Sequence, residues 1–231
     1  MEKKENIREL VTDMVTEIVA GREKSHILIR NVLDKYAYLP GYDRNFIKKV
    51  TEGTLERLIT IDYVLNSYSK VPVNKMKPFI RSLMRVSVYQ ILYLDKVPDS
   101  AACNEAVKLA QKRGFGPLKA FVNGVLRNVA RNKAAITFPD REKDLGKALS
   151  VLYSMPEHLV ELLLSQYGDK KAEDILKGYQ LERPVCVRLQ GNLSAEEKEQ
   201  ILQNWNTLGM EAKAHPWLSY AYELHQAGNL K

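Results

Sequence analysis

Residues 97–131 constrain the fold of this chain most strongly, because they have the pattern of two helices joined by a short break. The first helix is expected to start at Asp99 or Ser100, residue types that favour the N-cap position. Apolar residues then recur every three or four positions, as on one helix face: Ala102, Ala106, Val107, Leu109 and Ala110. The second helix has the same spacing in Phe121, Val122, Val125, Leu126 and Val129. Glycine and proline at positions 114, 116 and 117 separate the two, since Gly suits a helix end and Pro a first turn.

The chain upstream of this hairpin has the same helical periodicity and no strand-like alternation. Helices are predicted over residues 6–20, 28–36, 43–58, 61–65 and 76–94. Gly53 lies inside the third of these and indicates a close helix crossing, because the missing Cβ lets another element approach. Residues 1–135 are therefore predicted to form one all-helical domain.

The remaining sequence has a different character. Residues 136–152 are mostly polar and are predicted to be a linker, and residues 153–231 to be a small α+β module. Ser154 and Asp169 are placed at the starts of two helices. Residues 184–191 alternate like a strand, and Ser194 with Glu197 forms the S-x-x-E pattern of a capping box that opens a third helix. Residues 210–218 and 220–228 are expected to supply two more strands. The fold class predicted for the whole chain is mainly α, a helical bundle followed by this module.

Positive charge is concentrated in the first domain. Residues 1–140 contain 24 Lys or Arg against 15 Asp or Glu, a net +9, whereas residues 141–231 contain 11 against 13, a net −2. Such an asymmetry favours an anionic partner for one half of the chain, with nucleic acid the leading candidate.

Within that domain, the segment from residue 112 to residue 133 has six basic residues and no acidic one. These candidate RNA contacts are Lys112, Arg113, Lys119, Arg127, Arg131 and Lys133, and the N-terminal Lys3, Lys4 and Arg8 extend the set. Four to six phosphate contacts would give a slope of log K against log salt of about −3 to −4. The alternative is an ordinary solvated face. A second basic stripe, Lys77, Arg81 and Arg85, either binds phosphate or pairs with acids of a neighbouring helix.

The segments VPDSAACNEAVKLA and FVNGVLRNVAR closely resemble the signature of the NusB-like RNA-binding domain, in the variant fused to ribosomal RNA (cytosine-5)-methyltransferases of the RsmB (Sun) type. The matching residues are Val97, Pro98, Ala101, Asn104, Glu105, Ala106 and Val107, then Phe121, Val122, Asn123, Gly124, Val125, Leu126 and Arg127. The resemblance covers residues 6–133 and implies a compact bundle of six or seven helices. A looser resemblance, which departs at Glu157 and at Arg188-Leu189-Gln190, relates the later segments to the region before the catalytic domain.

The motif residues Asn104, Glu105, Asn123 and Gly124 are interpreted as structural. We expect the two amides to be partly buried and to hydrogen-bond between the motif helices, because an unsatisfied buried amide would cost about 1–3 kcal/mol.

No catalytic residue is predicted, so no enzymatic activity is expected of this chain alone. The resemblance implies S-adenosylmethionine chemistry, with two catalytic cysteines that lie in a catalytic domain downstream. Cys103 and Cys186 do not match those motifs and are expected to be structural. The four histidines lack the short spacings of metal sites, so neither a metal nor a cofactor is expected here.

Two functions remain open. The first is the RNA-binding portion of a small-subunit ribosomal RNA methyltransferase that positions the RNA. The alternative is a protein-interaction or transcription antitermination module, which docks ribosomal or transcription-elongation proteins through Tyr89, Leu92 and Tyr93, unless these residues belong to the core. The charged N-terminus and the lack of a long apolar run favour a cytoplasmic protein without a membrane partner.

Overall fold

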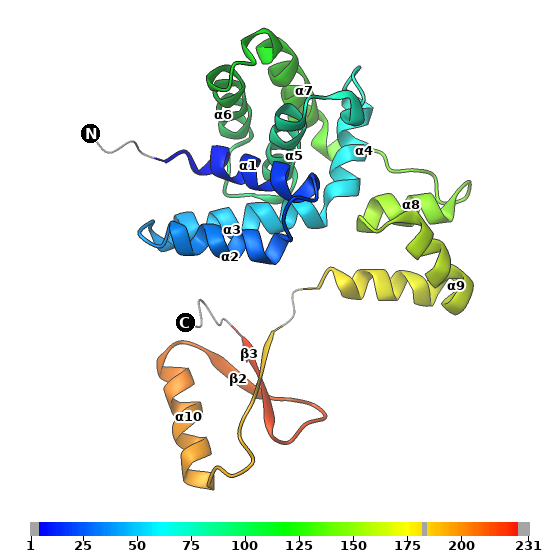
Figure 1. Ribbon diagram of the computed structural model, residues 1–231. Coiled ribbons are helices and arrows are strands. Elements are labelled where there is room, and N and C mark those ends of the chain that lie inside the picture. The colour runs from blue at the N-terminus through cyan, green and yellow to red at the C-terminus, as the bar shows by residue number, and fades with distance from the viewer. Residues whose placement is uncertain (1–4, 182–183, 226–231) are drawn as a thin grey trace. The chain divides into compact units, whose positions relative to one another are not determined.

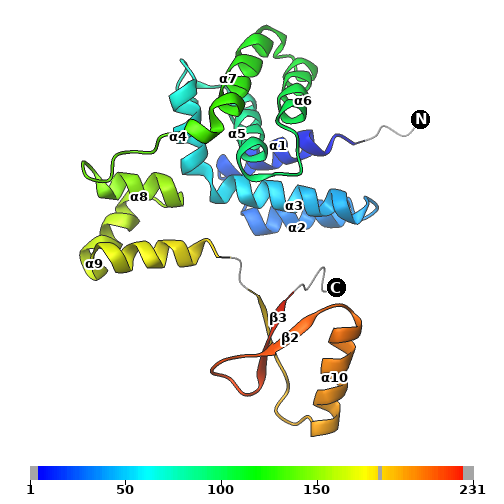
Figure 2. The same cartoon turned by 180° about the vertical axis from the view of Figure 1, so that it is seen from behind.

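A computed structural model describes residues 5–181 and 184–225 and divides the chain into two compact units, residues 1–177 and 178–231. Figures 1 and 2 show the elements of each unit from opposite sides. Among the described residues, none of the helices combines the length and the apolar character needed to span a membrane. The predicted fold class, a mainly helical chain with a small α+β module, is confirmed.

The first unit is built from helices and short 3₁₀ turns, and its last helix, α9, runs two residues past the boundary at residue 177. The helices are α1 (Ile7–Val19), α2 (Ser25–Lys35), α3 (Gly41–Glu56), α4 (Leu58–Tyr68), α5 (Pro78–Tyr93), α6 (Asp99–Lys112), α7 (Lys119–Asn132), α8 (Leu145–Tyr153) and α9 (Glu157–Tyr179). The 3₁₀ turns are Val73–Lys75, Gly116–Leu118 and Lys133–Ala135.

Helix α5 is the centre of the bundle, and α1, α3, α4, α6 and α7 all pack against it (Figure 1). Its residues from Ser82 to Ile91 are buried without interruption, so it has no solvent face there. Arg85 lies in this stretch and makes a bidentate hydrogen bond to Asp62 of α4, at 2.7 and 2.5 Å. The alternative that the second basic stripe pairs with acids of a neighbouring helix therefore holds at Arg85, which cannot face phosphate.

Gly53 of α3 accommodates an aromatic side chain of α5 rather than a backbone. A Cβ at this position would overlap the phenol ring of Tyr89. Tyr89 is 7% exposed and stacks on Tyr93 with ring centroids 5.4 Å apart. Tyr89 is thus a core residue and not the centre of a docking patch.

Helix α8 occupies part of the predicted linker, so that prediction is wrong from residue 145 onward. Asp144 caps α8 by accepting a hydrogen bond from the backbone N–H of Lys147 at 2.9 Å. The hydroxyl of Thr60 donates to the carbonyl of Val151 at 2.6 Å, and both groups are buried. These bonds attach α8 to α4, which is why the first unit extends far beyond the predicted boundary at residue 153.

Helix α9 is kinked at Gly168, whose φ of 72° and ψ of 169° are not helical. The predicted division into two helices near Asp169 therefore agrees with the structure. Leu149 of α8 packs with Val160 and Leu176 of α9 in a small hydrophobic cluster of its own.

The second unit contains β1 (Val185–Arg188), α10 (Ala195–Thr207), β2 (Glu211–Ala214) and β3 (Ala221–His225). The strands form an antiparallel sheet in the order β1-β3-β2. The capping box predicted for α10 is present, with Ser194 and Glu197 bonded reciprocally at 2.7 and 3.1 Å. Trp205 of α10 meets Tyr222 of β3 edge to face, which places α10 on one face of the sheet.

Candidate nucleic-acid interface

The outer face of α7 bears a stripe of polar and basic residues. We define the α7 stripe as Lys119, Asn123, Arg127 and Arg131, which are four residues apart and so rise about 6 Å per step along the helix. The opposite face is buried in the core through Val122, Val125, Leu126 and Val129. Lys119, Arg127 and Arg131 are exposed, and Asn123 is half-buried.

The charge of the α7 stripe is not balanced locally. Helix α7 contains no Asp or Glu. Among the described residues, no ion pair or hydrogen bond is found for the guanidinium groups of Arg127 and Arg131. Within the described part of the chain, the hydrogen bond found for the Lys119 ammonium is a long one, 3.3 Å, to the side chain of Gln111. The three cations therefore remain available to an anionic ligand.

Gly124 lies beside the α7 stripe and is exposed. Apart from its chain neighbours and the adjacent backbone of α7, no atom of the described residues lies within 4 Å of the position that a Cβ would take. The helix backbone is thus accessible between Asn123 and Arg127, and the glycine is not explained by packing.

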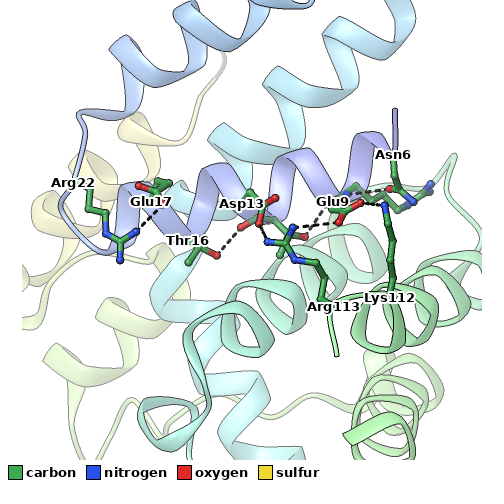
Figure 3. Close-up of polar contacts among 10 residues, drawn as sticks. Asn6, Glu9, Asp13, Thr16, Glu17, Arg22, Lys112 and Arg113 are labelled. Carbon is green, nitrogen blue, oxygen red and sulfur yellow. Dashed lines mark hydrogen bonds and ion pairs between the residues drawn. The ribbon is translucent and has the colours of Figure 1, made fainter. Parts of the chain in front are cut away.

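Two of the predicted RNA contacts are instead held by acids of α1 (Figure 3). Arg113 donates to Asp13 at 2.6 Å and to Glu9 at 3.3 Å, and Lys112 also pairs with Glu9. The Arg113 guanidinium additionally lies 4.6 Å from the centroid of the Phe79 ring. These contacts connect the end of α6 to α1, so Lys112 and Arg113 have a structural role.

Two of the other predicted basic residues, Lys133 and Arg8, are also held by neighbouring side chains. Lys133 pairs with Asp99 at 2.9 Å. Arg8 donates from Nε to Gln90 at 2.8 Å and lies over the Phe46 ring at 5.3 Å. Lys3 and Lys4 lie outside the described residues.

The predicted hydrogen bonds of Asn104 and Asn123 between the two motif helices are not found in the described part of the chain. Asn104 is exposed, contrary to its predicted partial burial, whereas Asn123 is half-buried. Glu105 pairs with Lys108 at 2.8 Å, one turn along its own helix. The predicted N-cap also differs, because Pro98 takes that position and Asp99 is the first helical residue.

Burial raises the pKa of two titratable groups near this surface. The pKa of Asp13 is raised, chiefly by burial and also by the charge of Glu9, against the opposing effect of Arg113. Burial likewise raises the pKa of the Cys103 thiol, although Arg127 opposes the shift. Cys103 is only 2% exposed, so it is not an activated nucleophile.

A concave surface that the sequence did not predict lies between α1, α3 and the segment after α5. Its two adjoining hollows, of about 530 and 680 Å³, share Tyr42, Phe46, Lys96 and Val97. Acidic residues, Glu5, Asp43, Asp95 and Glu105, contribute to its lining. They make this groove, which we call the α3 groove, less suitable for a polyanion than the α7 stripe.

The second unit brings together potential metal ligands that are scattered in the sequence. Cys186, His215 and Glu223 each place a ligand atom within 4.8 Å of the others. Their positions 29 and 8 residues apart carry no recognisable metal-site spacing, and only strand pairing could have revealed the group.

Comparisons with known proteins agree with the fold. The NusB family profile matches residues 5–131. The probable ribosomal RNA small subunit methyltransferase B of Bacillus subtilis (strain 168) is 31% identical over 211 residues, 91% of this chain and 46% of that protein. The transcription antitermination protein NusB of Kineococcus radiotolerans is 37% identical over 89 residues, 38% of this chain and 65% of that protein.

Among solved structures, the crystal structure of PH0851 matches with a TM-score of 0.64 over 99% of this chain and 51% of that chain. Its sequence identity of 14% makes this a likeness of fold alone. The chain spans less than half the length of the curated methyltransferases that it matches.

Proposed function

The chain belongs to the NusB family, and we propose that its helical unit binds RNA through the α7 stripe, as the portion of a ribosomal RNA methyltransferase that positions small-subunit RNA for methylation. The observation that carries this proposal is the pair of exposed guanidinium groups of Arg127 and Arg131 on a helix without acids. The methyltransferase relative, whose match extends over both units, supports the assignment to ribosomal RNA.

The α7 stripe suits contacts to the RNA backbone. Arginine forms planar, bidentate hydrogen bonds to phosphate, and such contacts fix register and orientation rather than sequence choice. Asn123 offers an amide on the same side, and the bare backbone at Gly124 permits close approach. We assign no described residue to methyl transfer or to S-adenosylmethionine.

The number of available cations sets the expected salt dependence. With Lys112, Arg113 and Lys133 paired to acids, three cations of the stripe remain. At about 0.7 per phosphate contact for a single strand, log K should fall against log salt with a slope of about −2. This slope is shallower than the slope of about −3 to −4 that the sequence predicted for four to six phosphate contacts.

Fluorescence polarisation with a labelled single-stranded RNA tests the proposal. Arg127→Gln and Arg131→Gln should each weaken binding about 5-fold at 0.1 M salt and reduce the slope by about 0.7, the contribution of one counterion release. Lys147→Gln, at an exposed position of α8, is the matched control and should bind like the parent. A slope near zero for the parent, or equal losses in all three variants, would contradict the proposal.

A second function, docking of a partner protein, is favoured by the α3 groove. Tyr42 is 74% exposed at its edge, and the surrounding charges are of both signs, as at the polar rim of a protein interface. A pull-down with and without nuclease separates the two functions. Partners lost after RNA digestion indicate RNA binding, whereas partners retained after digestion but lost in Tyr42→Ala indicate docking.

A further inference from the structure

We infer that Cys186, His215 and Glu223 form a binding site for one Zn²⁺ ion on the sheet of the second unit. The three side chains come from different strands or strand ends, and their ligand atoms lie within 4.8 Å of one another. Thiolate, imidazole and carboxylate are the three ligand types that zinc takes in proteins, commonly in a tetrahedron whose fourth position is left to water. The site belongs entirely to residues 178–231.

Strand register explains why these residues meet. Cys186 of β1 and Glu223 of β3 are direct partners in the antiparallel ladder, so their side chains lie on the same face. His215 follows β2, and its backbone N–H donates to Ala221 at 3.0 Å, which continues the ladder by one pair. His215 is therefore a diagonal neighbour of Glu223 on that face.

This face is the one that α10 does not cover. Tyr222, which contacts Trp205 of α10, neighbours Glu223 and points to the opposite side. Cys186 is exposed, and His215 and Glu223 are half-buried, so an ion can reach the group from solvent without rearrangement of the core.

The charges around the group are compatible with a cation. Lys213, the ladder partner of Glu223 on β2, directs its ammonium to Glu211 at 3.4 Å. His225 places Nε2 3.7 Å from Glu223, and this nitrogen has no hydrogen-bond partner among the described residues. Among residues 184–225, the Glu223 carboxylate thus has no strong competing partner.

A zinc site also fits the small core of the second unit. Its buried apolar side chains in the described residues are Leu189, Met210, Ala221 and Leu224. Small modules with few buried residues commonly use a structural metal. An ion bound by the three residues would cross-link β1, β3 and the end of β2.

The hydrogen bond between His215 and Trp217 gives zinc binding a spectroscopic signature. Its Nδ1 accepts a hydrogen bond from the backbone N–H of Trp217 at 3.3 Å. Zinc at Nδ1 occupies that lone pair, and zinc at Nε2 requires the proton on Nδ1, so binding through either nitrogen breaks this bond. Trp217, which is 86% exposed and edge-on to the His215 ring, should then change its fluorescence.

The test is titration of the full chain, freed of metal under reducing conditions, with Zn²⁺ against a chromophoric chelator and with Co²⁺ in the visible range. We expect one equivalent of metal to bind and a thiolate-to-Co²⁺ charge-transfer band to appear. Cys186→Ser should weaken binding more than about 100-fold, which exceeds the loss caused by replacing residues that only hydrogen-bond to a ligand. His215→Asn and Glu223→Gln should weaken it by at least about 10-fold. Trp217→Phe should abolish the fluorescence change, while Trp205 remains.

Matched controls in the first unit are Cys103→Ala and His158→Asn, which should bind Zn²⁺ like the parent. Absence of stoichiometric binding, or unchanged binding in Cys186→Ser, would overturn the site. Loss in Cys186→Ser with parental binding in both His215→Asn and Glu223→Gln would overturn the three-residue assignment, since a lone thiolate would then explain the result.

Discussion

Arg113 donates a hydrogen bond from Nη2 to Oδ1 of Asp13 across 2.6 Å, and this contact joins the end of α6 to the middle of α1. One turn earlier on α1, Glu9 pairs with Arg113 and with Lys112. Two acids of the bundle thus take the position that phosphates were predicted to occupy. Under the proposed function, neutralisation by α1 should limit the phosphate contacts of this region to the cations of the α7 stripe.

Removing both acids should therefore increase RNA affinity. In the double variant Glu9→Gln, Asp13→Asn, Lys112 and Arg113 become available to phosphate. The slope of log K against log salt should steepen by about 1.4, two contacts at about 0.7 each, to about −3.5. Salt titrations of RNA polarisation measure it. Glu17→Gln is the control, because Glu17 lies on α1 but pairs with Arg22; an equal slope in the double variant and the parent would show that the two cations lie too far from the RNA path.

The raised pKa of Asp13 predicts a pH dependence of stability. A carboxyl that binds its proton more tightly in the folded than in the unfolded chain contributes stability at low pH. This contribution is lost as the pH rises from the ordinary value of 3.8 through the raised pKa of the folded state. The free energy of unfolding of the parent should therefore fall over this pH window relative to that of Asp13→Asn. Urea unfolding of both proteins between about pH 3 and about pH 7 measures the difference, and a relative gain by the parent would show that the ion pair with Arg113 outweighs burial.

Two glycines inside helices should respond oppositely to alanine. Gly124→Ala fills open space on an exposed helix face and should raise the free energy of unfolding by up to about 1 kcal/mol. Gly53→Ala forces a Cβ into the ring of Tyr89, and overpacking of this kind costs about 1–3 kcal/mol, so the protein should be destabilised despite the better helix former. Denaturant unfolding compares the two. Tyr89→Leu shortens the opposing side chain and should make Gly53→Ala less costly; purely additive effects would show that the ring is not the obstacle.

Apolar periodicity was sufficient to predict the α6–α7 hairpin, whose inward positions such as Ala106 and Val125 are buried. The same periodicity contradicts the burial predicted for Asn104, which lies two residues from both Ala102 and Ala106 and hence on the other side of the helix. The resemblance to a family motif led to the wrong prediction there. The local phase of the helix was the better guide.

Contacts between distant segments could not be predicted in this way. Arg113 and Asp13 are 100 residues apart, and no local pattern shows that α1 returns to the end of α6. Cys186, His215 and Glu223 likewise meet only through the pairing of the strands, which no local pattern shows. Ser154 was expected to start a helix; instead it ends α8 with a φ of 54°, and its Oγ accepts a hydrogen bond from the backbone N–H of Ile59.

The attachment of α8 to α4 gives a final prediction. Thr60→Val keeps the shape of the side chain but leaves the buried carbonyl of Val151 without its donor, at a cost of about 1–3 kcal/mol in the free energy of unfolding. Thr54→Val is the matched control. The Thr54 hydroxyl is equally buried, but it donates to the carbonyl of Val50, four residues earlier in α3. Because this carbonyl lies inside a helix, a backbone N–H can satisfy it when the hydroxyl is removed. Thr60→Val should lower the denaturation midpoint more than Thr54→Val and should accelerate limited proteolysis between residues 136 and 144. Equal midpoints and equal cleavage rates in the two variants would show that the Thr60 hydroxyl does not hold α8 in place.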